Sequence, residues 1–217
     1  MDRERLNAIF DKIKAFFAKQ GAPHSAKRVR RRNYILAYLH DLVFLIAGAL
    51  LIFSLLFRII VVSGPSMKDT LVDGDCLLLL DNTFFNEYDR GDVVVISKQT
   101  YDNGTPIIKR VVATEGQTVD IDFEKGIVYV DGKALNEPYI KTPTNRKEGV
   151  EFPLTVDDGC LFVMGDNRND SKDSRSPEIG LIDKHEILGK AIFILFPGNE
   201  GGALKREYSR IGVCHNG

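Results

Sequence analysis

The stretch LVFLIAGALLIFSLLFRIIVVSGPSMKDTL, residues 42–71, decides the fold of this chain. All of its residues up to Phe57 are apolar or small, and apart from Arg58 the apolar run continues to Val62. A helix needs roughly 20 apolar residues to cross the hydrocarbon core of a bilayer, so the run predicts a membrane anchor. The long side chain of Arg58 could reach the headgroups from near the end of such a helix. Ser66 follows four residues after Val62, so a reactive serine there would act on something in or on the same membrane.

The charges on either side of the anchor, which we place at residues 34–62, differ in sign. Residues 1–33 hold ten Lys or Arg and three acidic residues, a net charge of +7, whereas the chain from Ser63 onward has a net charge of −8. Positive charge collects on the cytoplasmic side of a membrane span. We therefore expect a single-pass protein of the cell membrane with a cytoplasmic N-terminus and an extracytoplasmic domain over residues 63–217. The expected partner at the basic end is the lipid bilayer rather than nucleic acid.

The apolar run is predicted to stay in the mature protein. A cleavable signal peptide has a shorter basic region, a shorter apolar core and a small-residue cleavage site, and none of these fits the sequence. Within the 33-residue basic arm, apolar residues recur at the three- and four-residue spacing of an amphipathic helix. This arm could lie on the inner leaflet of the membrane, or it could become helical only with a partner. The apolar positions are Leu6, Ile9, Phe10, Ile13, Phe16 and Phe17.

The sequence after Ser63 favours β structure. Short apolar or β-branched runs are separated by turn signals such as Asp73-Gly74 and Asp131-Gly132. The predicted strands are Cys76–Leu80, Asp92–Ser97, Ile107–Ala113, Thr118–Asp122, Gly126–Val130, Cys160–Met164 and Gly189–Phe196. The fold class is therefore mainly β: one N-terminal transmembrane helix followed by an all-β barrel-like or sandwich domain. A more polar, proline-containing stretch at about 123–158 is predicted to be a smaller inserted β or loop region.

The cysteines and histidines give no sign of a metal or cofactor. Cys76, Cys160 and Cys214 lack the spacing of a metal site, and one disulfide among them is possible without being required. We therefore expect neither a metal nor another cofactor.

Ser66 needs a base before it can act as a nucleophile. His185 and His215 are the histidines beyond the anchor, and neither has a suggestive setting. Lys109 lies in TPIIKRVVAT, where a strand would place Ile107, Lys109 and Val111 on one face. Apolar neighbours lower the pKa of a lysine, as a lysine base requires. The alternative is an edge strand protected from pairing by its Lys-Arg pair.

The polar segment MGDNRNDSKDSR, residues 164–175, directly follows an apolar strand and allows two interpretations. Five oxygen-bearing residues from Asn167 to Glu178 fall at the positions of a calcium loop, but the first is not Asp and the sixth is Lys172 rather than Gly. The other interpretation is a loop held by its own carboxylate–arginine pairs that presents a hydroxyl to a site.

Taken together, these segments resemble the bacterial type I signal peptidases, membrane-anchored Ser/Lys proteases that remove signal peptides from exported proteins. Four segments carry the resemblance in order: SGPSMKDTL, GDVVVI, IIKRVVATEGQTV and MGDNRNDSKDSR, from the anchor to about Pro197. The resemblance implies that Ser66 is the nucleophile, Lys109 the general base and Ser171 a hydrogen-bond partner that orients the lysine. It also implies a structural pair between Asp166 and Arg175, with Asp173 supporting the same loop, and it places Gly64 and Met67 in the nucleophile segment.

The chain departs from the family pattern in places. Asp69 stands where the family usually has proline, and Gly64 stands where some members have a serine that donates to the oxyanion. A side-chain oxyanion donor is therefore in doubt, and we expect the backbone N–H of Ser66 to serve.

The expected substrates are signal peptides with small residues at the cut, held in a shallow apolar cleft. Leu71, Leu77 to Leu80 and Ile107 are its predicted lining. Two other functions are compatible with parts of the sequence. One is a Ser-Lys self-cleaving protease, which the anchor argues against; the other is a catalytically inactive, membrane-tethered β module, which the intact Ser66 and Lys109 argue against.

Overall fold

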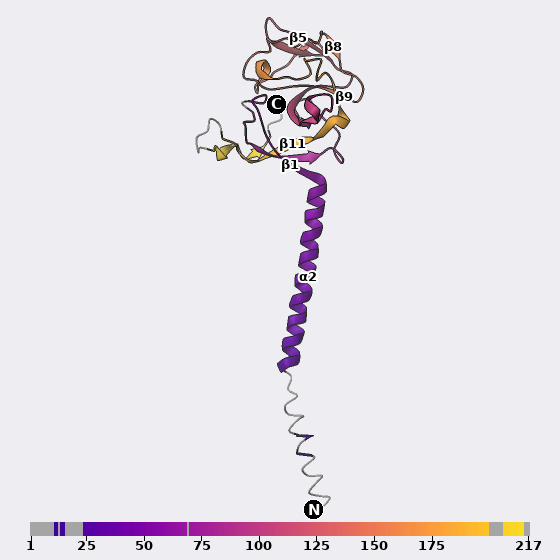
Figure 1. Ribbon diagram of the computed structural model, residues 1–217, viewed down its shortest axis with the longest axis vertical. Helices are drawn as coiled ribbons and strands as arrows, with labels where there is room; N and C mark the ends of the chain where they lie inside the picture. The colour runs from indigo at the N-terminus through magenta and orange to yellow at the C-terminus, as the bar shows by residue number, and fades with distance from the viewer. Residues whose placement is uncertain (1–10, 13, 16–23, 69, 200–205, 215–217) are drawn as a thin grey trace, which may run out of the picture. The chain divides into compact units, whose positions relative to one another are not determined.

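The computed structural model describes residues 11, 12, 14, 15, 24–68, 70–199 and 206–214 (Figure 1). The chain divides into two compact units, Met1–Ile52 and Phe53–Gly217. Most of the predicted amphipathic arm lies outside the described residues, as do Asp69 and His215.

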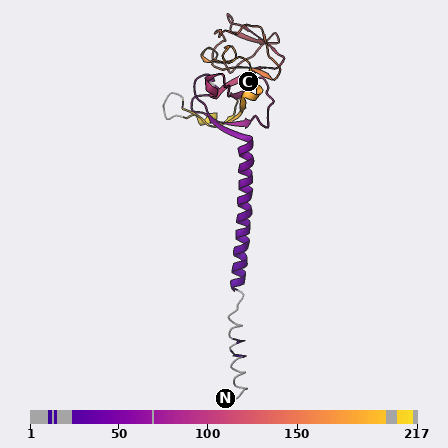
Figure 2. The same cartoon turned by 45° about the vertical axis from the view of Figure 1, so that its right-hand side comes forward.

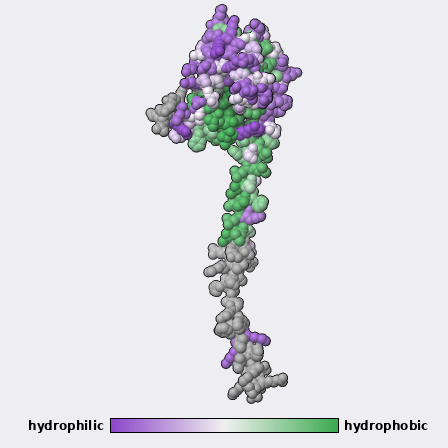
Figure 3. All heavy atoms as spheres, in the orientation of Figure 1, coloured by the Kyte–Doolittle hydropathy of each residue, from purple (hydrophilic) through white to green (hydrophobic). Residues whose placement is uncertain are grey.

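Helix α2 (His24–Leu56) contains the membrane-spanning candidate. Its part Tyr34–Leu56, 23 residues long, is long and apolar enough to cross a membrane. Figure 3 shows hydrophobic side chains along most of this stretch. The apolar residues are spread around the helix instead of forming one stripe, which suits a surrounding of lipid.

The predicted end of the anchor at Val62 is wrong. The helix ends at Leu56, and strand β1 (Phe57–Val61) pairs antiparallel with strand β2 (Cys76–Asp81). Arg58 forms an ion pair with Asp81 across these strands instead of reaching toward headgroups. The β-branched Ile and Val residues after Arg58 favour an extended backbone. The strand that they form pairs with β2.

The Phe53–Gly217 unit contains two antiparallel sheets. The larger sheet has the strand order β1-β2-β11-β3-β4-β9-β10, with β12 on the edge of β11, and the smaller has the order β7-β6-β5-β8. In the two ribbon views, β5 and β8 lie at the end of this unit farthest from β1 (Figures 1 and 2). The remaining strands are β3 (Val93–Ile96), β4 (Ile107–Thr114), β5 (Thr118–Asp122), β6 (Ile127–Val130), β7 (Lys133–Ala134), β8 (Leu154–Thr155), β9 (Cys160–Met164), β10 (Ile182–Asp183), β11 (Ile187–Phe196) and β12 (Gly212–Val213).

All seven predicted strands are present, each with its ends within two residues of the prediction. The smaller sheet runs from Thr118 to Thr155, so it begins five residues before the predicted insertion. Strands β1, β7, β8, β10 and β12 were not predicted. Four of them are two-residue strands, too short to show an alternating pattern, and β1 is hidden in the continuous apolar run.

Alternation along the strands divides the core into three clusters. On β3, Val93 and Val95 pack into one cluster with Met67 and Leu77, whereas Val94 and Ile96 pack into a second on the opposite face. A third cluster joins β9 to the strands of the smaller sheet. The central strand β3 is therefore buried on both faces, which gives a rigid base for its neighbour β4.

Candidate active site

Ser66 lies in a loop that connects β1 to β2. The loop is closed at its base because the Val62 N–H donates to the Asp75 carbonyl (2.8 Å) and the Gly74 N–H donates to the Val62 carbonyl (2.9 Å). We call residues 62–75, apart from Asp69, the Ser66 loop. Met67 anchors it, since this side chain is buried in the first core cluster, and its carbonyl accepts the Leu71 N–H at 2.8 Å. These contacts leave Ser66 half-buried at the surface of the core.

Lys109 meets Ser66 from the neighbouring strand β4. Its Nζ is 3.0 Å from Ser66 Oγ and donates to the Ile108 carbonyl at 3.0 Å, while the residue is only 3% exposed. The predicted strand faces are confirmed for Ile107 and Val111, which pack in the second cluster, and for Ile108, which packs in the first. Beyond a register shift after Val111 the alternation ends, and Val112 and Ala113 both pack in the third cluster.

The surroundings of Lys109 lower its pKa from about 10.5 to about 8. Burial is the main cause, because the ammonium loses its hydration when the side chain is enclosed. Nearby carboxylates of Asp173, Glu148 and Asp166 act in the opposite direction and keep the pKa from falling further. A substantial fraction of the amine is therefore neutral near pH 8.

Ser171 is buried close to this pair, but the hydrogen bond predicted between Ser171 and Lys109 is not present. Ser171 Oγ has no hydrogen-bond partner among the described residues, since the Lys109 amine is directed at Ser66 and the Ile108 carbonyl. The Ser171 side chain packs against Gly165. A Cβ on Gly165 would come within 2.2 Å of Ser171 Oγ and 2.6 Å of the Ser66 carbonyl oxygen, so only glycine fits between them.

Gly64 adopts a backbone conformation with φ of +93°, which favours glycine over other residues. Its N–H donates to Asp73 Oδ1 at 3.0 Å and is therefore not directed at the site. The backbone N–H of Ser66 makes no hydrogen bond within the described part of the chain. The role of this N–H as an oxyanion donor stays a prediction.

The predicted pair between Asp166 and Arg175 is wrong. Asp166 instead binds Arg110, the neighbour of Lys109, through two hydrogen bonds of 2.8 and 2.7 Å. Both side chains are completely buried, and Thr70 Oγ1 also donates to Asp166 at 2.5 Å. Asp166 thus connects the strand of Lys109 to the loop of Ser66.

Arg175 forms its ion pair with Asp173, two residues away in the same loop. Nε and Nη2 of Arg175 donate to the two Asp173 oxygens at 2.8 Å each, and Asp173 Oδ2 also accepts the Gly165 N–H at 2.9 Å. Arg168, in the same segment, pairs with Glu137. Carboxylate–arginine pairs therefore hold this loop, and Asp173, one of the proposed calcium ligands, is bound by Arg175.

A cleft of about 230 Å³ opens beside Ser66 and Lys109. Apolar side chains from the end of β1 and the start of β4 line it, including Ile60, Val62 and Ile107. The predicted lining is right for Ile107 and wrong for Leu77 to Leu80, none of which lines the cleft. Leu77 and Leu79 are buried in the first core cluster, and residues of β1, which pairs with β2, line the cleft instead.

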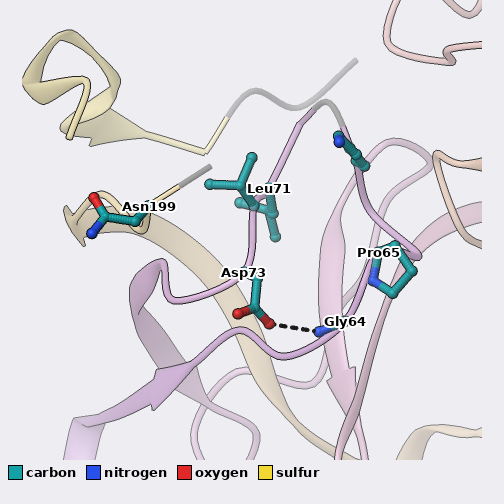
Figure 4. A pocket seen from close by; sticks show the side chains of 7 residues that line it. Gly64, Pro65, Leu71, Asp73 and Asn199 are labelled. Atoms are coloured by element: carbon teal, nitrogen blue, oxygen red, sulfur yellow. Dashed lines mark hydrogen bonds between the residues drawn. The ribbon is translucent and has the colours of Figure 1, made fainter. Parts of the chain in front are cut away.

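A second hollow, of about 310 Å³, lies on the other side of Gly64 and Pro65 (Figure 4). Figure 4 shows the residues around this hollow, with Leu71 and Asp73 from the Ser66 loop and Asn199 from the segment after β11. The dashed line in the same view marks the hydrogen bond from Gly64 to Asp73. Leu71, which we had placed in the substrate cleft, lines this hollow instead.

His185 is excluded as the partner of Ser66. Its side chain is 96% exposed and its Nδ1 is 2.7 Å from Asp183, at a short 3-10 turn (Lys184–Glu186). Among the described residues, no group of three or more His, Cys, Asp or Glu side chains could hold a metal ion. The three cysteines are free thiols.

Sequence reasoning missed three residues that shape the site. The role of Gly165 is visible only from its close packing in the structure, and no pattern in the sequence indicated this role. Asp75 is completely buried and binds Arg210, which lies 135 residues later in the chain. A buried acid in the apolar context of VDGDCLLLL was a usable signal for Asp75, because buried charges need partners.

Comparison with known proteins identifies the family of the chain. The family model described as "Signal peptidase, peptidase S26" matches residues 35–196. The "Signal peptidase I" of Bacillus licheniformis is 35% identical over 184 residues, covering 80% of this chain and 95% of the relative. The "Probable signal peptidase I-1" of Synechocystis sp. is 38% identical over 166 residues, covering 71% and 81%.

Among solved structures, the crystal structure of a signal peptidase I from Enterococcus faecalis is 27% identical and aligns with a TM-score of 0.39. That alignment covers 48% of this chain and 96% of the other. On the family match and the curated relatives, the chain belongs to the signal peptidase family, peptidase S26.

Proposed function

We propose that this protein is a membrane-anchored serine endopeptidase that cleaves signal peptides from exported proteins, with Ser66 as nucleophile and Lys109 as general base. The observation that carries the proposal is the 3.0 Å contact between Lys109 Nζ and Ser66 Oγ in a buried setting beside an apolar cleft. A neutral lysine at this distance can accept the hydroxyl proton of Ser66. A serine needs such a base before it can act as a nucleophile.

The reaction follows from these positions. Neutral Lys109 takes the Ser66 proton as Oγ attacks the scissile carbonyl carbon, and the backbone N–H of Ser66 binds the oxygen that becomes negative. The Lys109 ammonium then gives its proton to the leaving amine, the C–N bond breaks, and an ester on Ser66 remains. A water molecule, deprotonated by Lys109, attacks the ester, and the released Oγ recovers the proton.

An extended substrate segment suits the cleft. Strand β1 is the edge strand of its sheet, and β9 begins to pair with β4 only at Arg110, so Ile107 to Lys109 have a free edge on that side. A peptide in extended conformation could hydrogen-bond to either free edge and place alternate side chains in the cleft. The apolar lining and small volume favour small side chains at the cut.

The same proposal places the site outside the cytoplasm. Helix Tyr34–Leu56 would cross the membrane with the basic residues before it in the cytoplasm. Ser66 follows the helix end by only ten residues. A signal peptide is cut just beyond its own apolar segment, so enzyme and substrate would meet at a similar depth.

Purified full-length protein in detergent, incubated with a precursor whose signal ends in A-x-A, tests the proposal. The unmodified protein should release the mature product, and Ser66→Ala should release none while melting at the same temperature. Thr100→Ala is the matched control, because this hydroxyl is exposed and outside the cleft. Cleavage by Ser66→Ala at the parent rate, or no cleavage by the parent, would refute the proposal.

A further inference from the structure

The chain end returns to the Ser66 loop. We call Tyr208–Cys214 the C-terminal strap; it consists of a 3-10 turn (Tyr208–Arg210) followed by β12. Strand β12 pairs with Phe193 and Ile194 of β11. It lies on the same side of β11 as β3, which pairs with the first residues of β11. Cys214 is buried in the first core cluster with Met67, so the strap and the Ser66 loop share one core.

Arg210 is the contact between strap and loop. Its guanidinium donates to both oxygens of Asp75, at 2.9 and 2.6 Å, and to the carbonyl of Thr70 at 3.1 Å. Asp75 is completely buried, and it also accepts the backbone N–H groups of Val72 (2.8 Å) and Gly198 (2.7 Å). The planar guanidinium therefore fixes two points of the loop at once, one on each side of Leu71.

These contacts extend to the strand that carries the base. Thr70, whose carbonyl Arg210 holds, donates its hydroxyl to Asp166, and Asp166 is bound by Arg110. Arg110 is the residue after Lys109 on β4. A continuous set of hydrogen bonds thus runs from the strap through the loop of Ser66 to the strand of Lys109.

We propose that Arg210 is a positioning residue: the strap sets the Ser66 loop against Lys109 and so sustains turnover, although it touches neither reacting group. The family match ends at residue 196, so it does not cover the strap. This inference rests on the proposed function. Arg210 does not line the cleft, so its loss should reduce kcat while leaving KM nearly unchanged. A displacement of about 1 Å at a catalytic pair costs up to about 10²-fold in rate.

Full-length protein in detergent provides the test, with cleavage of the A-x-A precursor as the readout. Arg210→Ala should lower kcat by about 10- to 100-fold, and Arg210→Lys should be intermediate, because an ammonium reaches fewer of the three acceptors. Free guanidinium ion at millimolar concentration should restore part of the activity of Arg210→Ala, since this side chain is 20% exposed and its site opens to solvent. Arg206→Ala, an exposed arginine just before the strap, is the control and should match the parent.

Thermal melting of each variant separates positioning from folding, because rates are compared well below every melting temperature. Parent-like kcat in Arg210→Ala would overturn the inference. A second result would also overturn it: the kcat of Arg210→Ala decreases in proportion to the fraction of folded protein, and guanidinium does not restore it. An inactive parent would instead refute the proposed function.

Discussion

Replacing Lys109 by methionine should stabilise the protein at neutral pH while abolishing its activity. Lys109 has its pKa lowered to about 8 in the folded protein, against about 10.5 unfolded. A lysine whose pKa is lowered in the folded protein does not change the free energy of folding when the pH is above its unfolded pKa. It destabilises the folded state most when the pH is below its folded pKa. Between pH 10.5 and pH 8, therefore, the folded protein loses stability as pH falls.

The magnitude follows from the two pKa values. Proton linkage gives a cost of roughly 3 kcal/mol at pH 7 and roughly 1 kcal/mol at pH 10. Methionine has a similar length and carries no charge, so it removes this cost but also loses the hydrogen bonds to Ser66 and Ile108. The free energy lost with these two hydrogen bonds is nearly independent of pH. It therefore cancels when the stability difference at pH 7 is compared with that at pH 10. The stability of Lys109→Met relative to the parent should thus be greater at pH 7 than at pH 10 by roughly 2 to 3 kcal/mol.

Urea unfolding of both full-length proteins in detergent, followed by tyrosine fluorescence, measures this difference. The chain contains seven Tyr and no Trp, so the signal comes from the tyrosines. Arg110, beside Lys109 but already paired with Asp166, stays in place in both proteins. An equal stability difference at pH 7 and pH 10 would show that Lys109 keeps its ordinary pKa when folded, and the assigned base would then lack its physical basis.

Three further predictions concern the site and its support. Asp166→Asn should lower the free energy of unfolding by about 3–5 kcal/mol, because it leaves the buried Arg110 without its counter-charge; urea unfolding at pH 7 measures this, and a loss below 1 kcal/mol would contradict it. Ser171→Ala should leave the melting temperature unchanged, since its hydroxyl has no partner among the described residues, yet slow turnover by about 10²-fold if the hydroxyl orients Lys109 during the reaction; unchanged turnover would remove Ser171 from the mechanism. A precursor with Phe at the first position before the cut should stay intact in a gel assay, because the cleft of about 230 Å³ has to hold alternate side chains of the substrate as well as its backbone beside the catalytic pair; cleavage equal to that of an alanine precursor would show a wider pocket.

The strands could be predicted from the sequence because each leaves a local pattern, whereas the roles of Ser66 and Lys109 were assigned by the resemblance of four segments to a family. Short β-branched runs between turn residues marked the seven main strands. Lys109 could be singled out because it interrupts an apolar strand, and burial then dictates the direction of its pKa. For the strands the information lies within a few neighbouring residues, whereas the pairing of Ser66 with Lys109 depends on segments far apart in the chain.

The end of the anchor could not be predicted in this way. An apolar run has no period that distinguishes a membrane helix from a buried strand, so Phe57–Val61 continued the helix in the prediction. The pairing with β2, which decides the matter, depends on residues about twenty positions later in the chain.

The partners of the buried charges were equally beyond local reasoning. Three buried arginines (Arg110, Arg168 and Arg175) meet three carboxylates (Asp166, Glu137 and Asp173), and composition permits several pairings. Only the three-dimensional arrangement assigns Asp166 to Arg110 rather than to Arg175. The same holds for Arg210, which reaches Asp75 from the far end of the chain.

The most direct test of the central claim is the rate of precursor cleavage between pH 6 and pH 10 for the parent and for Lys109→Arg. For the parent, the rate should rise about tenfold per pH unit at low pH, reach half of its maximum near pH 8, and level off above that, as one lysine loses its proton. Lys109→Arg should be inactive at every pH, because a guanidinium stays charged throughout the range. A Lys109→Arg enzyme that retains most of the parent activity would show that Lys109 is not the base.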